Sequence, residues 1–218
     1  MGRLINREKL ARAKQQRELR KQRILDEAGS IFARMAYSEV TLDIIGQRAD
    51  VERGVTSMYF RSKENLFLIV FRNSLAEWYD SLEHEIRKGG GTWDRATLAS
   101  FLADSLARRP VLTRYLSLLP VVLEQDIDAM EVFRFQRWRC DRMSVVGAAL
   151  EKRTAALDEG HGSALLYRIQ LVAGGLEIAS NPRGPASFDR DDPDLAGLWM
   201  DMETELARFI SGFLSITS

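Results

Sequence analysis

The stretch TLDIIGQRADVERGVTSMYFRSKE, residues Thr41–Glu64, decides the fold of the N-terminal part of this chain. Thr41 is a favourable helix N-cap, and Leu42 and Ile45 give the residues after it a short apolar face at helical spacing. A break follows, then a second short helical pattern, and Ser62 opens a longer one. Two short helices joined by a tight turn predict a helix-turn-helix, which places its second helix in the major groove of DNA.

The sequence on both sides of this stretch also predicts helices. Ile24 to Tyr37 follows a helical period, and the pattern that Ser62 opens runs to about Lys88, where three glycines end it. Further helices are expected from a Thr92 cap to Arg109, between Pro110 and Pro120, from Asp128 to about Leu157, from His161 to Ala179, and from Leu195 through Phe213, with an exposed loop at Asn181–Asp194. Because the sequence holds no convincing strand pattern, hairpin signal or repeat, we predict an all-α fold.

Charge is unevenly distributed along the chain. The 218 residues are 45% hydrophobic and 28% charged, which indicates a globular protein, and the formal net charge is zero. Met1 to Lys63 nevertheless carries fourteen Lys and Arg against eight Asp and Glu, a net charge of +6 that the remaining residues balance with −6. The most basic part is Met1–Arg23, which fits either a solvated tail or an arm that touches phosphates. A basic N-terminal part on an acidic body predicts an anionic partner at one end.

Several functional classes lack the residues that they need. Cys140 is the single cysteine, so the chain forms neither an internal disulfide nor a Cys-based zinc site. His84 and His161 have no metal-ligand spacing, and no P-loop, nucleophile elbow or dinucleotide fingerprint is present. No apolar run is long enough to span a bilayer, and the N-terminus lacks a signal-peptide core. We therefore expect a cytoplasmic protein that is not an enzyme and holds no metal or cofactor.

The run RILDEAGSIFARMAYSEVTLDIIGQRADVERGVTSMYFRSKENLF resembles the DNA-binding domain of the tetracycline-repressor (TetR) family of bacterial regulators. The matching features are ILDEA in the first helix, Tyr37, Thr41, Ala49, Val51, Gly54, Tyr59-Phe60 and Ser62-Lys63-Glu64. The resemblance implies a three-helix DNA-binding domain at residues 23–68, after a basic extension at 1–22. It also implies a helical ligand-binding and dimerisation domain at 69–218.

The same resemblance implies roles for individual residues. The recognition helix is expected at about Glu52–Phe60. Base contacts are expected from Arg53, Val55 and Ser57, and phosphate contacts from Thr41, Tyr59 and Lys63, with Gly54 in the same DNA-binding set. An Arg at this place can read guanine O6 and N7 with two hydrogen bonds, whereas a Lys and a Thr cap reach phosphate oxygens.

Three departures from the family pattern involve Asp50, Glu52 and the pair Ser57-Met58. Asp50 stands where the turn usually has Gly, and Asp tolerates the left-handed conformation better than most residues. Glu52 stands where Ser or Thr would cap the recognition helix, and Ser57-Met58 stands where aromatic residues are common. These departures mark where unusual DNA contacts are expected.

For the body, the resemblance implies a homodimer formed by the last two long helices. The residues expected in the dimer interface are Leu171, Gly174, Gly175, Ile178, Leu206, Phe209, Ile210 and Phe213. The ligand-pocket candidates are Trp93, Phe101, Tyr115, Phe133, Arg137, Trp138 and Cys140, although each aromatic residue also fits a plain core position. Arg137 would pair an anionic group of an apolar or amphipathic effector, unless its face of the helix is solvated, as the neighbouring Arg134, Arg139 and Arg142 suggest.

The expected function is therefore a repressor that binds a double-stranded DNA operator and is released by a small-molecule effector. The helix from Ser62 to Lys88 would couple the two activities. The alternative is a helical protein-interaction module that has lost ligand control or DNA binding.

Overall fold

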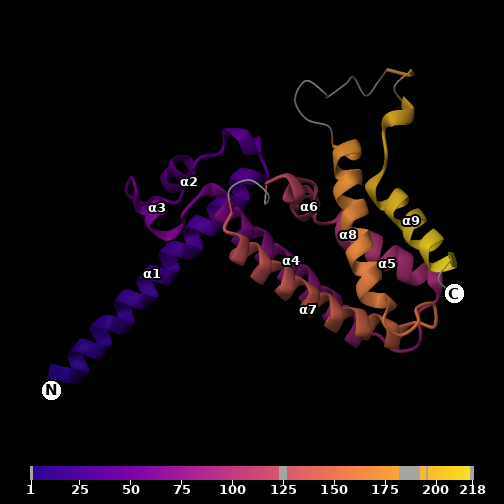
Figure 1. Cartoon of the computed structure of the whole chain (residues 1–218), viewed down its shortest axis with the longest axis horizontal. Coiled ribbons are helices and arrows are strands. Elements are labelled where there is room, and N and C mark those ends of the chain that lie inside the picture. The colour runs from indigo at the N-terminus through magenta and orange to yellow at the C-terminus, as the bar shows by residue number, and fades with distance from the viewer. Residues whose placement is uncertain (1, 123–126, 182–191, 195, 217–218) are drawn as a thin grey trace. The chain divides into compact units, whose positions relative to one another are not determined.

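The computed structural model describes residues 2–122, 127–181, 192–194 and 196–216 (Figure 1). The regular elements of these residues are helices, apart from one isolated bridge between Trp93 and Thr154. The predicted all-α class is thus confirmed. The chain divides into two compact units, Met1–Phe71 and Arg72–Ser218.

The first unit is a small helical domain built on one long helix. Its elements are α1 (Gly2–Phe32), the 3-10 turn η1 (Tyr37–Glu39), α2 (Leu42–Arg48), α3 (Val55–Tyr59) and the first residues of α4 (Lys63–Lys88). The core is apolar and includes the fully buried Ile24, Phe32, Ile45 and Phe60. The helix predicted over Ile24–Tyr37 is observed as the C-terminal part of α1, which also takes in the basic extension and ends at Phe32. Tyr37 lies in η1.

Side-chain caps fix where two helices of this unit begin. The Ile44 amide donates to Thr41 Oγ1 at 3.2 Å, and the Asn65 amide donates to Ser62 Oγ at 3.1 Å. Each bond satisfies one of the amides that a helix start leaves without an internal partner. Both caps were predicted from the sequence, and both are confirmed.

The second unit contains the rest of α4 and the C-terminal helices (Figure 1). These are α5 (Arg95–Ala107), α6 (Pro110–Val122), α7 (Ala129–Arg153), α8 (His161–Ser180), the 3-10 turn η3 (Ala196–Leu198) and α9 (Met202–Ile216). Helix α8 contacts α6, α7 and α9, and α9 also packs on α5. Helix α8 is therefore the central element of this unit.

Several predicted helix boundaries in this unit are wrong, and α7 ends at Arg153 rather than near Leu157. Asp94, not Thr92, caps α5: the Thr97 amide donates to Asp94 Oδ1 at 2.7 Å, and the pKa of Asp94 is lowered by hydrogen bonds from Thr97. Helix α6 continues past Pro120 to Val122. The final helix starts at Met202, because Asp201 caps it through the Thr204 amide at 2.8 Å. The predicted loop at 181–194 lies mostly outside the described residues.

Helices α7 and α8 meet backbone to backbone at a pair of glycines. A Cβ atom added to Gly147 would lie 2.7 Å from the carbonyl carbon of Gly162, and one added to Gly162 would lie 2.7 Å from the Cα of Gly147. Such separations are shorter than any normal non-bonded contact, so only glycine fits on either side. This contact sets the distance between α7 and α8, the helices that carry Arg139 and Gln170.

Candidate nucleic-acid interface and the helical body

The turn between α2 and α3 uses two residues with positive φ. Asp50 has a φ of 51° and Gly54 a φ of 81°, and Asp50 is the one non-glycine residue with positive φ among the described residues. The left-handed conformation is open to Gly and is tolerated by Asp better than by most residues. The prediction that Asp50 adopts this conformation is confirmed.

Gly54 also shortens the recognition helix. The predicted helix at Glu52–Phe60 is observed as α3, Val55–Tyr59, with Gly54 as its N-cap and no capping side chain. Its left-handed backbone interrupts the helix, so Arg53 and Glu52 belong to the turn. Arg53 therefore extends from a fixed turn and not from the helix itself.

Helices α2 and α3 touch at a glycine that the sequence reasoning missed. Gly46 is buried in α2, and a Cβ atom at this position would lie 2.5 Å from Thr56 Oγ1 of α3. Thr56 is itself 3% exposed. The signal in the sequence was Gly46 itself, which lies inside a helical pattern. Glycine lowers the stability of a helix, so its presence there indicates a packing requirement.

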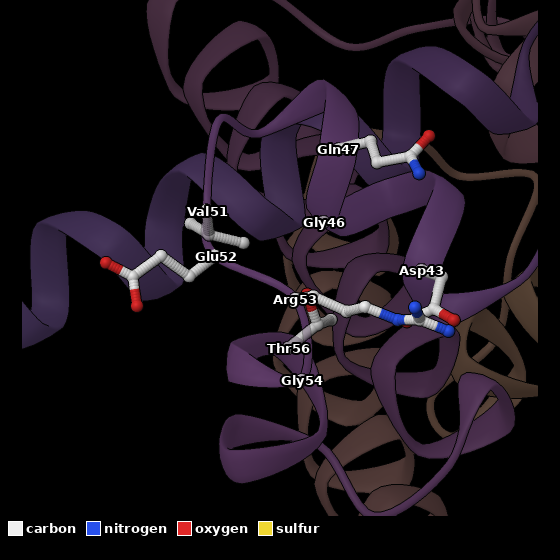
Figure 2. A pocket seen from close by; sticks show the side chains of 8 residues that line it. All are labelled: Asp43, Gly46, Gln47, Val51, Glu52, Arg53, Gly54 and Thr56. Atoms are coloured by element: carbon white, nitrogen blue, oxygen red, sulfur yellow. The ribbon is translucent and has the colours of Figure 1, made fainter.

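A pocket with a volume of about 270 Å³ lies where the turn joins the two helices (Figure 2). Its lining residues are Asp43, Gly46, Gln47, Val51, Glu52, Arg53, Gly54 and Thr56. Figure 2 shows the Arg53 side chain extending toward Asp43, with the Glu52 side chain pointing away from both. Arg53 is exposed there, and its guanidinium points away from the Glu52 carboxylate.

The remaining predicted DNA-binding residues differ in their exposure. Thr41 and Ser57 are exposed, and Val55 and Tyr59 are half-buried. The sequence reasoning noted Met58 but did not include it in the site. Its side chain is 79% exposed on α3, which is unusual for a large apolar residue. An exposed apolar side chain on such a helix can contact the methyl group of thymine.

Lys63 is held in place by Tyr37, the first residue of η1. Its ammonium donates to the Tyr37 carbonyl oxygen at 3.0 Å and lies 4.2 Å from the centroid of the Tyr37 ring. The Tyr37 hydroxyl donates to the Glu64 carboxylate at 2.8 Å. A Lys ammonium has three donors. The bond to Tyr37 leaves Lys63 oriented with donors still available for an anion.

The pocket residues predicted for the body differ in their surroundings. The Trp93 and Phe101 rings are 4.7 Å apart, Tyr115 is buried so that its pKa is raised, and Trp138 lies 4.9 Å from the Arg72 guanidinium. Phe133, Arg137 and Cys140 do share one face of α7 with Ser144, as their spacing predicts. That face is exposed to solvent, with Phe133 58% exposed.

Buried polar groups lie on the other face of α7, and the sequence reasoning misjudged one of them. Arg139, interpreted as a sign of solvation, is only 5% exposed. Its Nε donates to Gln170 Oε1 at 3.1 Å, and its guanidinium lies 5.2 Å from the Tyr167 ring centroid. Gln170 also donates to the Tyr79 hydroxyl at 3.1 Å, and burial raises the pKa of Tyr79. We call Tyr79, Arg139 and Gln170 the polar cluster.

The polar cluster holds a positive charge without a matching negative one. Within the part of the chain that the structure describes, Arg139 has no carboxylate in ion-pair contact, whereas the neighbouring Arg142 pairs with Asp80 at 2.6 Å and Glu83 at 2.9 Å. A buried cation without a counter-charge is costly. Buried, unusually placed charges are frequent at functional sites.

The residues predicted for the dimer interface divide into exposed and buried sets. On α8, Leu171 is 51% and Ile178 is 64% exposed. A Cβ atom on Gly175 would meet nothing within 4 Å, whereas one on Gly174 would lie 2.9 Å from the Leu116 backbone of α6.

The predicted interface residues of the last helix divide in the same way. On α9, Leu206 and Ile210 are fully buried in their own subunit, and Phe209 and Phe213 are half-exposed. The most exposed of the predicted interface side chains therefore lie on α8.

Neither a membrane-spanning helix nor a group of metal-binding side chains is found in the described ranges. None of their helices combines the length and apolarity needed to cross a membrane. Within the same ranges, His, Cys, Asp and Glu side chains form no group of three or more that could hold a metal ion.

Comparison with known families gives matches over both units. The family model described as bacterial regulatory proteins, tetR family, matches residues 24–70, and the model described as tetracyclin repressor-like, C-terminal domain, matches residues 72–215. Comparison with curated protein sequences gives no match.

Comparison with solved structures gives matches at low sequence identity. The fatty acid degradation regulator FadR from Bacillus halodurans has a TM-score of 0.54 and 14% identity, covering 89% of this chain and 93% of that one. The TetR family repressor AlkX from Dietzia sp., implicated in biodegradation of n-alkanes, has a TM-score of 0.49 and 15% identity, covering 90% of this chain and 96% of that one.

Proposed function

Because the chain belongs to the tetracycline-repressor family of bacterial transcriptional regulators, we propose that it is a homodimeric repressor that leaves its operator when a small molecule binds the body. The observation that carries the proposal is the helix-turn-helix, with its capped α2, its two left-handed turn residues and its exposed Arg53. These features fix the position of α3 and leave its outer side free to enter a major groove.

The proposed contacts divide into base reading and phosphate binding. Arg53 reads a guanine, Val55 and Ser57 contact neighbouring base edges, and Met58 contacts a thymine methyl group. Thr41, Tyr59 and Lys63 bind phosphates, while Gly54, which lacks a side chain, lets the backbone approach the duplex. The orientation of Lys63 by Tyr37 supports its assignment to a fixed phosphate contact.

The first prediction separates these two roles. Arg53→Ala should weaken operator binding by roughly 1–3 kcal/mol, about 5- to 150-fold, and relax the preference for one base pair. Lys63→Ala should weaken specific and non-specific binding alike and lower the salt slope by about one for each protomer. The measurement is fluorescence anisotropy across a KCl series, using an operator selected by the wild-type protein from random duplexes.

Arg34→Ala is the matched control, because Arg34 is an exposed arginine of the same unit outside the proposed contacts. It should change affinity by less than either variant. If the wild-type protein selects no DNA and shows no salt-dependent affinity, the repressor proposal fails and the interaction-module alternative is favoured.

For the effector, we propose a molecule with an anionic group that pairs with Arg139 in the polar cluster. The support is a buried guanidinium that has only neutral partners among the described residues. An anion would form charge-assisted hydrogen bonds with it. Repression is relieved if this anion binds one conformation of the dimer more tightly than the other.

The second prediction tests the anionic group through Arg139→Met. Replacing an unpaired buried cation by an apolar side chain of similar length should leave the apo protein as stable as wild type, or more stable. Medium- and long-chain carboxylates should raise the melting temperature of the wild type by about 6–10 °C near saturation, and they should have little effect on Arg139→Met. Differential scanning fluorimetry measures both.

The alcohol of each chain length is the matched probe, since it lacks only the charge. Alcohols that stabilise the wild type as strongly as the acids would contradict an anionic effector. Arg137→Met is the matched variant, because Arg137 lies on the exposed face of the same helix, and it should keep the response to carboxylates.

A further inference from the structure

The N-terminal half of α1 is a basic helix that no apolar contact explains. Between residues 7 and 23 it carries eight basic side chains, and the described side chains before Lys21 are all exposed. The basic residues are Arg7, Lys9, Arg12, Lys14, Arg17, Arg20, Lys21 and Arg23. The leucines Leu10 and Leu19 of this segment are exposed, so no buried apolar face keeps it ordered in water. Its positive charge indicates an anionic partner.

Part of this charge lies on the face of α1 that packs against the DNA-binding core. At 100° per residue, Arg7, Lys14, Arg17 and Lys21 fall within an arc of about 80° around the helix axis. The same arc continues into Leu25, Ala28 and Phe32, which are buried in the core of the unit. One face of α1 therefore changes from apolar to basic where it leaves the core.

A direct contact ties this basic face to the recognition helix. The Arg17 guanidinium lies 5.7 Å from the ring centroid of Tyr59, the last residue of α3. Within this unit, the basic face thus passes beside α3. From Arg17 to Arg7 the helix extends about 15 Å further, which corresponds to about four base pairs of DNA.

We propose that Arg7, Lys14 and Lys21 of each protomer bind backbone phosphates of the duplex whose major groove receives α3. We call these three residues the arm face. This inference rests on the proposed function, since it requires α3 to enter DNA, and it adds a second binding element outside the helix-turn-helix. The arm face contributes affinity and register but no base reading. Arg7 and Lys14 are exposed and Lys21 is half-buried, and their positive charges complement the negative charges of the phosphates.

The test compares two triple variants with the same change in charge. The arm-face variant is Arg7→Gln, Lys14→Gln and Lys21→Gln, and the control is Lys9→Gln, Arg12→Gln and Arg20→Gln on the opposite side of the helix. Arg17 is kept in both because it contacts Tyr59. Circular dichroism verifies that both proteins remain helical.

Affinity for the selected operator is measured across a KCl series. Each phosphate contact contributes about 0.9 to the salt slope, so six lost contacts in a dimer should lower it by about 5, while the control should change it by less than 1. Affinity of the arm-face variant should fall at least about tenfold at low salt. Phosphate-ethylation interference identifies the phosphates whose modification blocks binding. The control should retain a set of these positions that the arm-face variant lacks.

Equal slopes for the two triple variants, or an unchanged ethylation pattern, would overturn the arm contact. This failure is distinct from failure of the proposed function. If the wild type selects an operator and Arg53→Ala weakens it while the arm-face variant binds normally, only the arm contact is wrong. If the wild type selects no operator, the repressor proposal itself is wrong.

Discussion

Leu171→Asp combined with Ile178→Asp should convert the protein to a monomer that binds its operator at least about 1,000-fold more weakly. Both side chains are more than half exposed on α8, and with Tyr167 and Gly175 they form one continuous face of that helix. An exposed apolar face of this kind marks an interaction surface. A carboxylate buried in a dimer interface without a partner is strongly unfavourable.

The loss of affinity follows from the loss of one recognition helix. A monomer reads a single half-site, so binding should approach the non-specific level, which is typically at least a thousandfold weaker than specific binding. Analytical ultracentrifugation reports the mass and anisotropy reports the affinity. Val145→Asp is the control, because Val145 is an apolar α7 residue that is 50% exposed. A double variant that remains dimeric would show that α8 is not the interface.

Gly147→Ala should lower the free energy of unfolding by about 3 kcal/mol, near the upper end of the usual cost of overpacking. The added methyl group would lie 2.7 Å from the carbonyl carbon of Gly162, and both helices must separate to admit it. For a chain of this size the melting temperature should fall by about 6–12 °C. Gly162→Ala should have a similar effect, because it meets the same contact from the other side.

Gly212→Ala is the matched control for this change. Gly212 lies inside α9, and a Cβ atom there would meet nothing within 4 Å. Alanine is the better helix former, so this variant should be more stable than wild type by about 0.5–1 kcal/mol. Scanning calorimetry at one fixed protein concentration compares the three, since dimer stability depends on concentration. Equal melting temperatures for Gly147→Ala and Gly212→Ala would contradict the backbone contact.

Local chemistry explains which predictions were confirmed. Thr41 and Ser62 cap the helices that follow them, and Asp50 takes a positive φ in the turn. Each outcome depends on a side chain and the few backbone groups beside it. The same logic failed at Thr92, because Asp94 offers a stronger acceptor two residues later. The spacing of apolar residues does not predict which of two nearby capping residues will begin the helix.

Periodicity also placed residues on a common face without revealing its surroundings. Phe133, Arg137 and Cys140 do share a face of α7, but that face is exposed. Arg139, a residue type that is usually solvated, is buried beside Gln170. Which side of α7 turns inward is decided by its packing on α8. That packing brings together residues far apart in the chain.

The sequence by itself determined the all-α fold, the family and the helix-turn-helix, because these follow from local caps, turn residues and a run of matching positions. Tertiary structure alone decided the contacts of Gly46, Gly147 and Gly162, the burial of Arg139 and the approach of Arg17 to Tyr59. Each of these depends on how closely two helices approach, and that distance is a property of the packed pair rather than of either sequence segment.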